Sequence, residues 1–361
     1  MLSQQVMTSR IDNLRKQMEC LRADGLLAIK LENRRYLSGF GGSSGAVLVT
    51  RDVTLLITDF RYIEQAGQES PHCEVVKQEG TLDAAICSAV HRLSIQRLAV
   101  EEDTVTVEQW NKLRETGAQL VSAAGAVEKL RLVKSAEEIQ IIERAMRATE
   151  QALAEALQNF KIGMTEAEAA IELECGIRRH GADRIKPNFV VASGPRSALP
   201  HGRPTSRVIQ PGDFLVMDIG GFVEGYYSDV TRTVVFSDPS PRQREVYNLV
   251  LSGQMLALEA IGPGVPGEQV DAMVRKLFAE KGFRDEFGHS LGHGVGLALH
   301  EAPRLARGFG QPLRSGMVVT VEPGLYISGW GGIRIEDMVV ITENGVRNLT
   351  TAPKELQSVG L

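Results

Sequence analysis

The 361-residue sequence contains few cysteines and no long apolar run. Its four cysteines form no C-x-x-C pair and stand at Cys20, Cys73, Cys87 and Cys175. This scatter is typical of reduced thiols and argues against a disulfide framework or a zinc ribbon. No window approaches the roughly 18 apolar residues of a membrane helix, and the first residues lack a signal-peptide pattern. We therefore expect a cytoplasmic protein with no membrane partner.

A strong excess of basic residues is also missing. The chain has 40 Lys and Arg against 45 Asp and Glu, which gives a net charge of −5 and a pI near 5.9. Domains that bind nucleic acid usually gather Lys and Arg on one face and have a pI above about 9. The sequence therefore predicts that nucleic acid is not a partner.

The first third of the chain alternates helical and extended patterns, which is typical of an α/β domain. Apolar residues at helical spacing predict an amphipathic helix over residues 9–24. Strands are expected at 26–30, 46–50, 53–58, 74–77 and 97–101, with helices around residue 62 and over 82–93 and 107–115. A small-residue stretch at 122–127 then marks a boundary, and the length suffices for two cores. We predict two domains, residues 1–126 and 127–361.

The second part of the chain predicts two pairs of helices, each followed by strands. One long helix is expected over 128–159, and the next over 165–180 begins with Thr165 and Glu168 at the spacing of a capping box. Two further helices are expected over 243–261 and 267–281. Between the pairs, residues 214–236 form two apolar runs separated by a Glu-Gly turn signal, the pattern of a β-hairpin.

This hairpin carries an aspartate in each strand. Folding about a centre near residue 223 or 224 places Asp218 and Asp229 nearly opposite each other. Opposed like charges destabilise a sheet by up to about 1 kcal/mol, and an apolar setting increases that cost. We therefore predict that a positive group lies between them. Two solvated aspartates on an exposed face remain the alternative from this segment alone.

Three histidines follow in a glycine-rich segment, residues 288–301. They are His289, His293 and His300. The four glycines among them argue against a regular helix and predict a loop or a broken strand that presents the imidazoles. A single histidine is more often a satisfied structural residue than a ligand, so this segment gains weight only in combination with others.

Two later strands add further polar groups. The strand at 317–326 has Glu322 at its rim, just before a Pro-Gly turn. In the strand at 331–341, Arg334 and Glu336 share a face because side chains alternate, while Asp337 points the other way. A lone glutamate at a strand end is usually solvated. Several such groups, each inside an otherwise apolar run, indicate one shared site.

The settings of five of these residues resemble a known family. MDIGG, SDVTRT, GHGVGL, VEPGLY and RIED surround Asp218, Asp229, His293, Glu322 and Glu336. They resemble the metallopeptidases that include methionine aminopeptidase, aminopeptidase P and prolidase. The likeness covers about 130–361, and segments 33–45 and 58–66 extend it toward the aminopeptidase P and prolidase branch. It implies a creatinase-like N-terminal α/β domain and a C-terminal "pita-bread" domain with pseudo-two-fold symmetry.

The resemblance implies a centre of two divalent metal ions. Four carboxylates and one imidazole suit Mn²⁺ first, with Co²⁺ or Zn²⁺ as alternatives, and the lack of a cysteine ligand argues against a structural zinc. Asp229 and Glu336 would bridge the ions, Asp218 would complete one site, and His293 with Glu322 would complete the other. Such a pair lowers the pKa of a bridging water and polarises the scissile carbonyl.

The resemblance also implies catalytic roles for residues that bind no metal. His201, His289 and His300 match histidines of the proline-cleaving branch, which would donate to the substrate carbonyl and assist proton transfer. Arg334 would brace a ligand carboxylate, with a surface ion pair as its alternative. Glu322 would shuttle a proton. One departure precedes Val190: this chain has Lys-Pro-Asn at 186–188 where relatives often carry Ser-Phe-Asp, and we expect it to affect the substrate pocket and not the metals.

Our first functional interpretation is an Xaa-Pro aminopeptidase, a homodimer that acts on peptides with proline at the second position. The segments at 33–45 and 58–66 favour that branch. Xaa-Pro dipeptidase, or prolidase, is the nearest alternative. A metal-free creatinase-like hydrolase and a non-catalytic binding protein are more remote, because all five ligand residues are present.

Overall fold

The computed structural model describes residues 2–123, 125–187 and 189–360, so Ala124 and Asn188 of the segments discussed above lie outside the described residues. The chain divides into two units, Met1–Arg131 and Leu132–Leu361. The predicted domain boundary after residue 126 falls at the start of helix α6 (Ala126–Arg131). Within the described ranges, no helix combines the length and the apolar character needed to cross a membrane.

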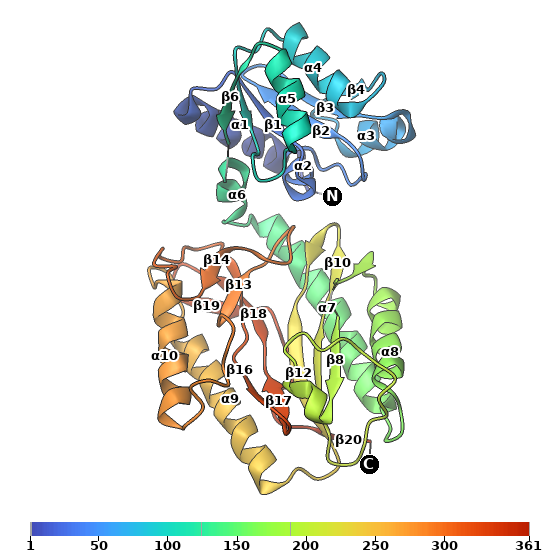
Figure 1. The fold of residues 1–361 in the computed structure, drawn as a ribbon, viewed down its shortest axis with the longest axis vertical. Helices are drawn as coiled ribbons and strands as arrows, with labels where there is room; N and C mark the ends of the chain where they lie inside the picture. Colours follow the sequence, from blue (N-terminus) through green and yellow to red (C-terminus); the bar gives the residue numbers. More distant parts are fainter. Residues whose placement is uncertain (1, 124, 188, 361) are drawn as a thin grey trace. The chain divides into compact units, whose positions relative to one another are not determined.

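The N-terminal unit is built on one six-stranded sheet with the strand order β4-β3-β2-β1-β5-β6 (Figure 1). Strand β1 (Gly25–Ala28) pairs antiparallel with β2 (Ala46–Thr50) and parallel with β5 (Arg97–Val100). The other strands are β3 (Thr54–Thr58), β4 (Glu74–Lys77) and β6 (Gln119–Ser122). The helices are α1 (Gln4–Leu21), α2 (Leu31–Ser38), α3 (Ile63–Glu69), α4 (Leu82–Arg92), α5 (Val107–Glu115) and α6, with a 3-10 turn η1 (Phe60–Tyr62).

The predicted α/β pattern of this unit is confirmed. Strands β2 and β4 and helix α5 begin and end at the predicted residues, whereas α1 begins at Gln4 and ends at Leu21, before the predicted limits. Apolar residues of α4 and α5 pack with those of the central strands into one core. The alternation of periods in the sequence predicted five of the six strands of this sheet, whereas strand β6 and helix α2 were not predicted.

The C-terminal unit repeats one arrangement of elements. Each half has two helices followed by strands that form one of the two main sheets, and Figure 1 shows each helix pair alongside its own sheet. The helices are α7 (Ala136–Asn159), α8 (Glu166–Arg179), α9 (Pro241–Ala260) and α10 (Gly267–Glu280). The two main sheets have the orders β20-β12-β9-β8 and β14-β13-β15-β18-β19. This repetition agrees with the pseudo-symmetry that the resemblance implied.

The strands of this unit are short, and several of them carry or adjoin the predicted site residues. In the first half they are β7 (Arg184–Ile185), β8 (Val190–Ser193), β9 (Phe214–Ile219), β10 (Gly221–Val223), β11 (Tyr226–Tyr227) and β12 (Val230–Phe236), with the 3-10 turn η2 (Gly194–Ala198). In the second they are β13 (Gly292–Gly294), β14 (Glu301–Leu305), β15 (Val318–Val321), β16 (Gly324–Ile327), β17 (Gly331–Arg334), β18 (Asp337–Ile341), β19 (Val346–Asn348) and β20 (Ser358–Val359).

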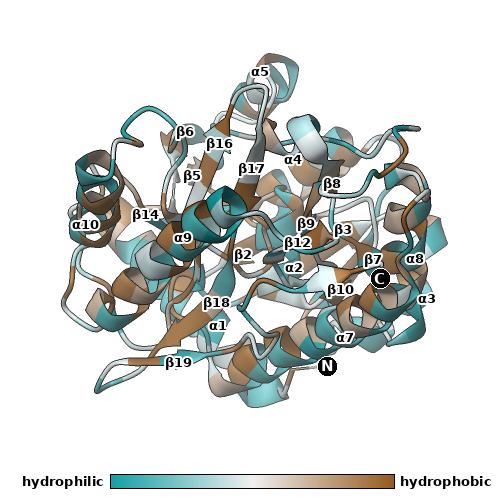
Figure 2. Ribbon diagram, turned by 90° about the horizontal axis from the view of Figure 1, so that it is seen from below, coloured by the Kyte–Doolittle hydropathy of each residue, from teal (hydrophilic) through white to brown (hydrophobic). Residues whose placement is uncertain are grey.

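The four helices of this unit are amphipathic to different degrees. In α10, Val270, Val274 and Phe278 are buried at helical spacing, and Figure 2 shows hydrophobic and hydrophilic residues together along this helix. The predicted capping box of α8 is confirmed, because the Thr165 side chain accepts from the Glu168 N–H and the Glu168 side chain accepts in return. Each helix thus buries one stripe against its sheet.

The single helix predicted over 128–159 is wrong. The structure has two helices, α6 and α7, because Ser135 caps a new helix. The Ser135 hydroxyl accepts from the N–H of Glu138, and the Glu138 side chain accepts from the N–H of Ser135. This capping box satisfies two backbone groups that would otherwise lack partners at the start of α7.

The predicted hairpin is present, but its register differs from the prediction. Strands β9 and β12 pair antiparallel, and the register sets Asp218 opposite Thr231. Glu224 and Gly225 both have positive φ and join β10 to β11 as a two-residue turn. That turn type places the centre between residues 224 and 225. Asp229 therefore lies one position before β12 and does not face Asp218 directly.

Asp337, in β18, forms ion pairs with two basic side chains of this unit. Its carboxylate accepts from Arg232 Nη2 at 2.8 Å and from Lys354 Nζ at 2.6 Å, and it is fully buried. Asp337→Asn should lower the free energy of unfolding by about 3–5 kcal/mol, because the buried Arg232 and the half-buried Lys354 lose their counter-charge. Urea denaturation of both proteins measures this difference. Glu280→Gln, which breaks an exposed pair with Lys276, should change it by less than about 1 kcal/mol.

The same carboxylate makes stability depend on pH. Burial alone would raise the pKa of Asp337, but the charges of Arg232 and Lys354 outweigh it and hold that pKa below its ordinary value. A lowered pKa stabilises the folded state above the unfolded value of about 3.9, and this contribution is lost as pH falls through the folded pKa. An equal acid sensitivity in wild type and Asp337→Asn would contradict this assignment.

Candidate metal and catalytic site

All predicted site residues line one cavity of about 260 Å³ in the C-terminal unit. The four carboxylates, the four histidines and the arginine come from both halves of the repeat. They are Asp218, Asp229, Glu322, Glu336, His201, His289, His293, His300 and Arg334. Lys186 and Arg304 line the same cavity. The fold thus brings together residues from distant parts of the chain.

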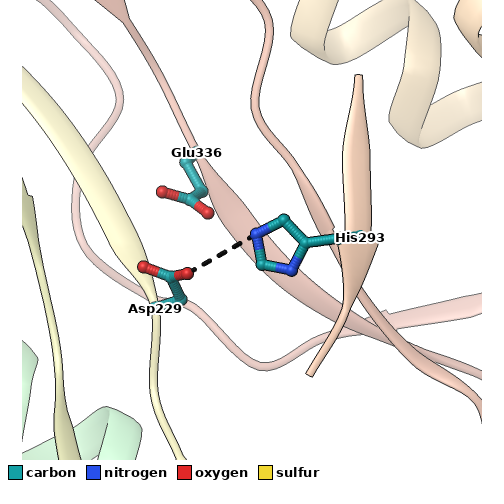
Figure 3. Close-up of side chains that lie close together, drawn as sticks. All are labelled: Asp229, His293 and Glu336. Atoms are coloured by element: carbon teal, nitrogen blue, oxygen red, sulfur yellow. Dashed lines mark ion pairs between the residues drawn. The ribbon is translucent and has the colours of Figure 1, made fainter. Parts of the chain in front are cut away.

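Asp229, His293 and Glu336 form a group that could hold a metal ion. Each offers one ligand atom, and these atoms all lie within 4.8 Å of one another. Figure 3 shows both carboxylates directed toward the imidazole. Asp229 lies just before β12, His293 lies in β13, and Glu336 lies just before β18. Three buried oxygen and nitrogen donors at this spacing suit a single divalent cation.

The orientation of His293 leaves one ring nitrogen directed at the acids. Nδ1 lies 3.1 Å from the Gly294 carbonyl oxygen, so a proton on Nδ1 donates there. Nε2 then carries the lone pair and lies 3.3 Å from Glu322 Oε1 and 3.7 Å from Asp229 Oδ2. A backbone acceptor that fixes the tautomer in this way is typical of histidines that bind metals.

The positions on either side of His293 are glycines because a larger residue would clash with the neighbouring backbone. A Cβ on Gly292 would meet the carbonyl oxygen of Thr320, and one on Gly294 would meet that of Ala302. Strand β13 therefore packs between β14 and β15 without side chains at these two positions. The predicted broken strand is confirmed.

Two threonines orient the glutamates. Thr320 Oγ1 donates to Glu322 Oε1 at 3.1 Å, and Thr231 Oγ1 donates to Glu336 Oε2 at 2.6 Å. Thr231 Oγ1 also accepts from Arg334 Nε at 3.0 Å. Sequence reasoning did not single out either threonine, although Thr231 stands in the SDVTRT segment, two positions after Asp229. Because side chains alternate along a strand, Thr231 shares a face with Asp229 and Thr320 shares one with Glu322, and this spacing could have identified both threonines.

Asp218 is surrounded by positive charge. Arg334 Nη2 donates to Asp218 Oδ2 at 2.6 Å, and Lys186 Nζ contacts Asp218 Oδ1 and Asp229 Oδ1. The predicted positive group between the two aspartates is therefore an ammonium of the chain itself. The expectation that the departure at Lys186 leaves the predicted metal ligands unaffected is wrong, because its side chain contacts two of them. No local signal in the sequence placed this long side chain here.

The electrostatics of the four carboxylates follow from burial and from these cations. Burial raises the pKa of Asp229 to about 6 and that of Glu322 to about 7, and it holds the pKa of Glu336 well above its ordinary value. Burial acts on Asp218 too, but Lys186 and Arg334 outweigh it and lower that pKa. For Asp229, Glu322 and Glu336 the two cations do not outweigh burial, so these are the acids that additional positive charge would stabilise.

The remaining histidines take different positions around the cavity. His289 has partners at both ring nitrogens, the Ser290 carbonyl at 2.8 Å and Tyr326 Oη at 2.9 Å. Burial, with the charge of Arg334, lowers its pKa to about 4. His300 packs edge-on against His293 with ring centroids 4.2 Å apart, and burial with the charge of His293 lowers its pKa to about 4. Both imidazoles are therefore neutral near pH 7.

Tyr326 is a further residue that sequence reasoning missed. Arg334 Nη1 donates to Tyr326 Oη at 2.6 Å, so this hydroxyl connects Arg334 to His289. Burial raises the pKa of Tyr326 to about 12. The residue stands at the end of the VEPGLY segment, in strand β16, and Glu322 lies outside that strand, so alternation along one strand could not have linked the two.

Comparison with known proteins identifies the family. Residues 140–343 match the model of metallopeptidase family M24, and residues 10–133 match that of the creatinase/prolidase N-terminal domain. This chain belongs to metallopeptidase family M24. It is 36% identical to an Xaa-Pro dipeptidase of Pyrococcus furiosus, over 97% of this chain and 100% of that protein.

Two solved structures extend the similarity of this M24 metallopeptidase. An Xaa-Pro dipeptidase from Bacillus anthracis superposes with a TM-score of 0.95 at 40% identity, covering 98% of this chain and 100% of that one. An X-Pro aminopeptidase from Thermotoga maritima has a TM-score of 0.90 at 37% identity, covering 97% and 99%. The chain therefore shares its fold and its two-domain organisation with a protein named as an Xaa-Pro dipeptidase and with one named as an X-Pro aminopeptidase.

The residues of this M24 metallopeptidase fit a divalent ion on one side of the cavity. Asp229, His293 and Glu336 offer donors within 4.8 Å of one another, and Glu322 lies beside His293. On the other side, both oxygens of Asp218 are already bound by Arg334 and Lys186. The donor set thus suits one ion on the side of the cavity where these residues lie.

Proposed function

We propose that this protein is a metal-dependent Xaa-Pro dipeptidase. The observation that carries the proposal is the single cavity shared by the metal-binding group and three further histidines. The Xaa-Pro dipeptidases of Pyrococcus furiosus and Bacillus anthracis, similar along the whole chain, support this substrate class. They favour the dipeptidase alternative over the aminopeptidase that the sequence suggested first.

The size and charge of the cavity also support a short substrate. Its volume of about 260 Å³ lies below the roughly 300–1,000 Å³ of usual ligand pockets. Arg304 lines it and is exposed to solvent. A dipeptide brings its terminal carboxylate close to the scissile bond, and a guanidinium is the side chain best shaped to bind that group. We assign this contact to Arg304.

A divalent ion at Asp229, His293, Glu322 and Glu336 would supply a Lewis acid for the scissile carbonyl and lower the pKa of water. Mn²⁺ is our first choice for this oxygen-rich donor set, with Co²⁺ or Zn²⁺ as alternatives. Homodimer formation and a cytoplasmic location stay proposals, to be measured by light scattering and by cell fractionation.

The chain's own residues take the remaining roles in this proposal. His201 and His300 donate hydrogen bonds to the substrate carbonyl as negative charge develops there, and they assist proton transfer to the leaving nitrogen. Glu322 holds a proton between the two halves of the reaction, as the resemblance implied. Arg334 braces Asp218. His289 acts as a positioning residue through Tyr326 and Arg334.

Substrate length and metal dependence test this proposal together. With Mn²⁺, kcat/KM for an Xaa-Pro dipeptide should exceed that for an Xaa-Pro-Xaa tripeptide by roughly 10- to 100-fold. That ratio corresponds to a charge-assisted hydrogen bond of about 1.5–3 kcal/mol. Prolonged EDTA treatment should abolish both activities. The measurement is a rate comparison on paired substrates before and after metal removal.

A pair of arginine variants sharpens the test. Arg304→Met should raise KM for the dipeptide and reduce its advantage over the tripeptide, whereas Arg307→Met removes an exposed arginine that does not line the cavity and should change neither. A tripeptide preference in the wild type would favour the X-Pro aminopeptidase, the second candidate function, which the Thermotoga maritima structure supports. Full activity after metal removal would refute both.

A further inference from the structure

One side of the cavity already holds a positive charge that belongs to the chain. Lys186 Nζ contacts Asp218 Oδ1 and Asp229 Oδ1, and Arg334 Nη2 donates to Asp218 Oδ2 at 2.6 Å. Side-chain cations thus bind both oxygens of Asp218 and one of Asp229. The other oxygen of Asp229 faces His293, as the dashed line in Figure 3 marks. Asp229 therefore divides the cavity into a lysine half and a metal half.

The position of Lys186 is determined by its surroundings. Its side chain is only 5% exposed, and its backbone N–H donates to the Gly220 carbonyl at 2.9 Å. Its Cδ would lie 3.4 Å from a Cβ on Gly220, so the stem runs closely over that glycine. A buried ammonium is costly unless it is paired and hydrogen-bonded. Asp218 and Asp229 supply that pairing here.

The ammonium and a second metal ion would require the same atoms. An ion in the lysine half must bind Asp218 Oδ1 and Asp229 Oδ1, the two oxygens that Lys186 contacts. Metal–oxygen bonds of about 2.0–2.2 Å leave no room for an ammonium between the same two oxygens. Occupation of this half by the lysine and by a metal ion is therefore mutually exclusive.

The charge of the cavity leads to the same result. Four carboxylates and the two basic side chains Lys186 and Arg334 carry a net charge of −2 in their charged forms. One divalent ion neutralises this charge. A second ion would leave an excess of two positive charges with Lys186 in place, or of one if the ammonium were displaced, and burial disfavours either excess.

We propose that Lys186 is a built-in cation that replaces one ion of the expected pair, so that this protein binds a single divalent ion at Asp229, His293, Glu322 and Glu336. This inference rests on the proposed metal-dependent function. An ammonium donates hydrogen bonds and accepts none, so Lys186 holds Asp218 and Asp229 in place without acting as a Lewis acid. It is a positioning residue that also sets the metal stoichiometry.

Metal stoichiometry tests the proposal without relying on activity. The full chain is stripped with a chelator, dialysed against rising Mn²⁺, and analysed for metal and protein by mass spectrometry. We expect the wild type to saturate at one Mn²⁺ per chain. Lys186→Ser and Lys186→Ala should reach two, a doubled ratio, with an electron paramagnetic resonance signal of two exchange-coupled Mn²⁺ ions.

A matched control removes another buried lysine. Lys134 Nζ pairs with Glu301 at 2.7 Å and contacts none of the proposed ligands, so Lys134→Met should keep the wild-type ratio. Two ions in the wild type would overturn the inference and leave the proposed function standing. No bound ion would refute both. Folded Lys186 variants that stay at one ion would also overturn it, and if they do not fold, the wild-type ratio decides.

Discussion

Asp229→Asn should lose its bound metal ion and lower kcat/KM for an Xaa-Pro dipeptide by more than about 100-fold. Loss of a group that merely supports a ligand already costs about 10- to 100-fold, and Asp229 is itself a member of the candidate group. An amide presents a neutral oxygen in place of a charged one. The measurements are metal content after dialysis and steady-state rates. Glu336→Gln should behave in the same way.

The control for this pair is an aspartate outside the cavity. Asp213 pairs with Arg207, and Asp213→Asn should retain both metal and activity. If Asp229→Asn and Glu336→Gln keep full activity and wild-type metal content, the ligand assignment is wrong. A loss of activity with the metal retained would instead assign these carboxylates to substrate binding or proton transfer.

His201→Ala and His300→Ala should each lower kcat by about 10²- to 10⁴-fold while the metal content stays unchanged. This is the usual range for a group that donates or transfers a proton in the transition state. Both residues line the cavity, and neither belongs to the candidate metal group. An effect confined to the transition state lowers kcat and kcat/KM together. The measurements are full Michaelis curves and metal analysis of each variant.

His180→Ala provides the matched control, because His180 pairs with Glu155 and does not line the cavity. It should keep the wild-type kcat. Loss of metal from His201→Ala or His300→Ala would make these residues ligands or structural supports. An increase in KM alone would indicate uniform substrate binding without a role in the transition state.

Local patterns in the sequence predicted most elements of the fold. Strand β2 and helix α5 have the predicted limits because their apolar periods and turn signals agree. The break before α7 was missed although Ser135 and Glu138 carry the capping-box pattern, because a continuous apolar stripe dominated the interpretation. The hairpin register was off because a one-residue change of turn centre alters every cross-strand pair.

The site depends on contacts between residues that are far apart in the sequence. Asp218 and Arg334 are 116 positions apart yet form a 2.6 Å ion pair, and no periodicity links such distant residues. The resemblance to a family supplied that link for the predicted ligands. It could not supply Lys186, since this position departs from the family pattern, and the direction of a long flexible side chain depends on the packed structure around it.

The hydroxyl of Thr231 holds the Glu336 carboxylate in place before an ion binds. A guanidinium only donates hydrogen bonds, so the hydroxyl accepts from Arg334 and its one hydrogen is committed to Glu336 Oε2. The direction of this hydrogen-bond chain is therefore fixed whenever the Glu336 carboxylate is ionised, which is the form that binds metal. The Glu336 carboxylate is preorganised, and an incoming ion meets a ligand that has already lost its rotational freedom. Little conformational entropy remains to oppose metal binding at this position.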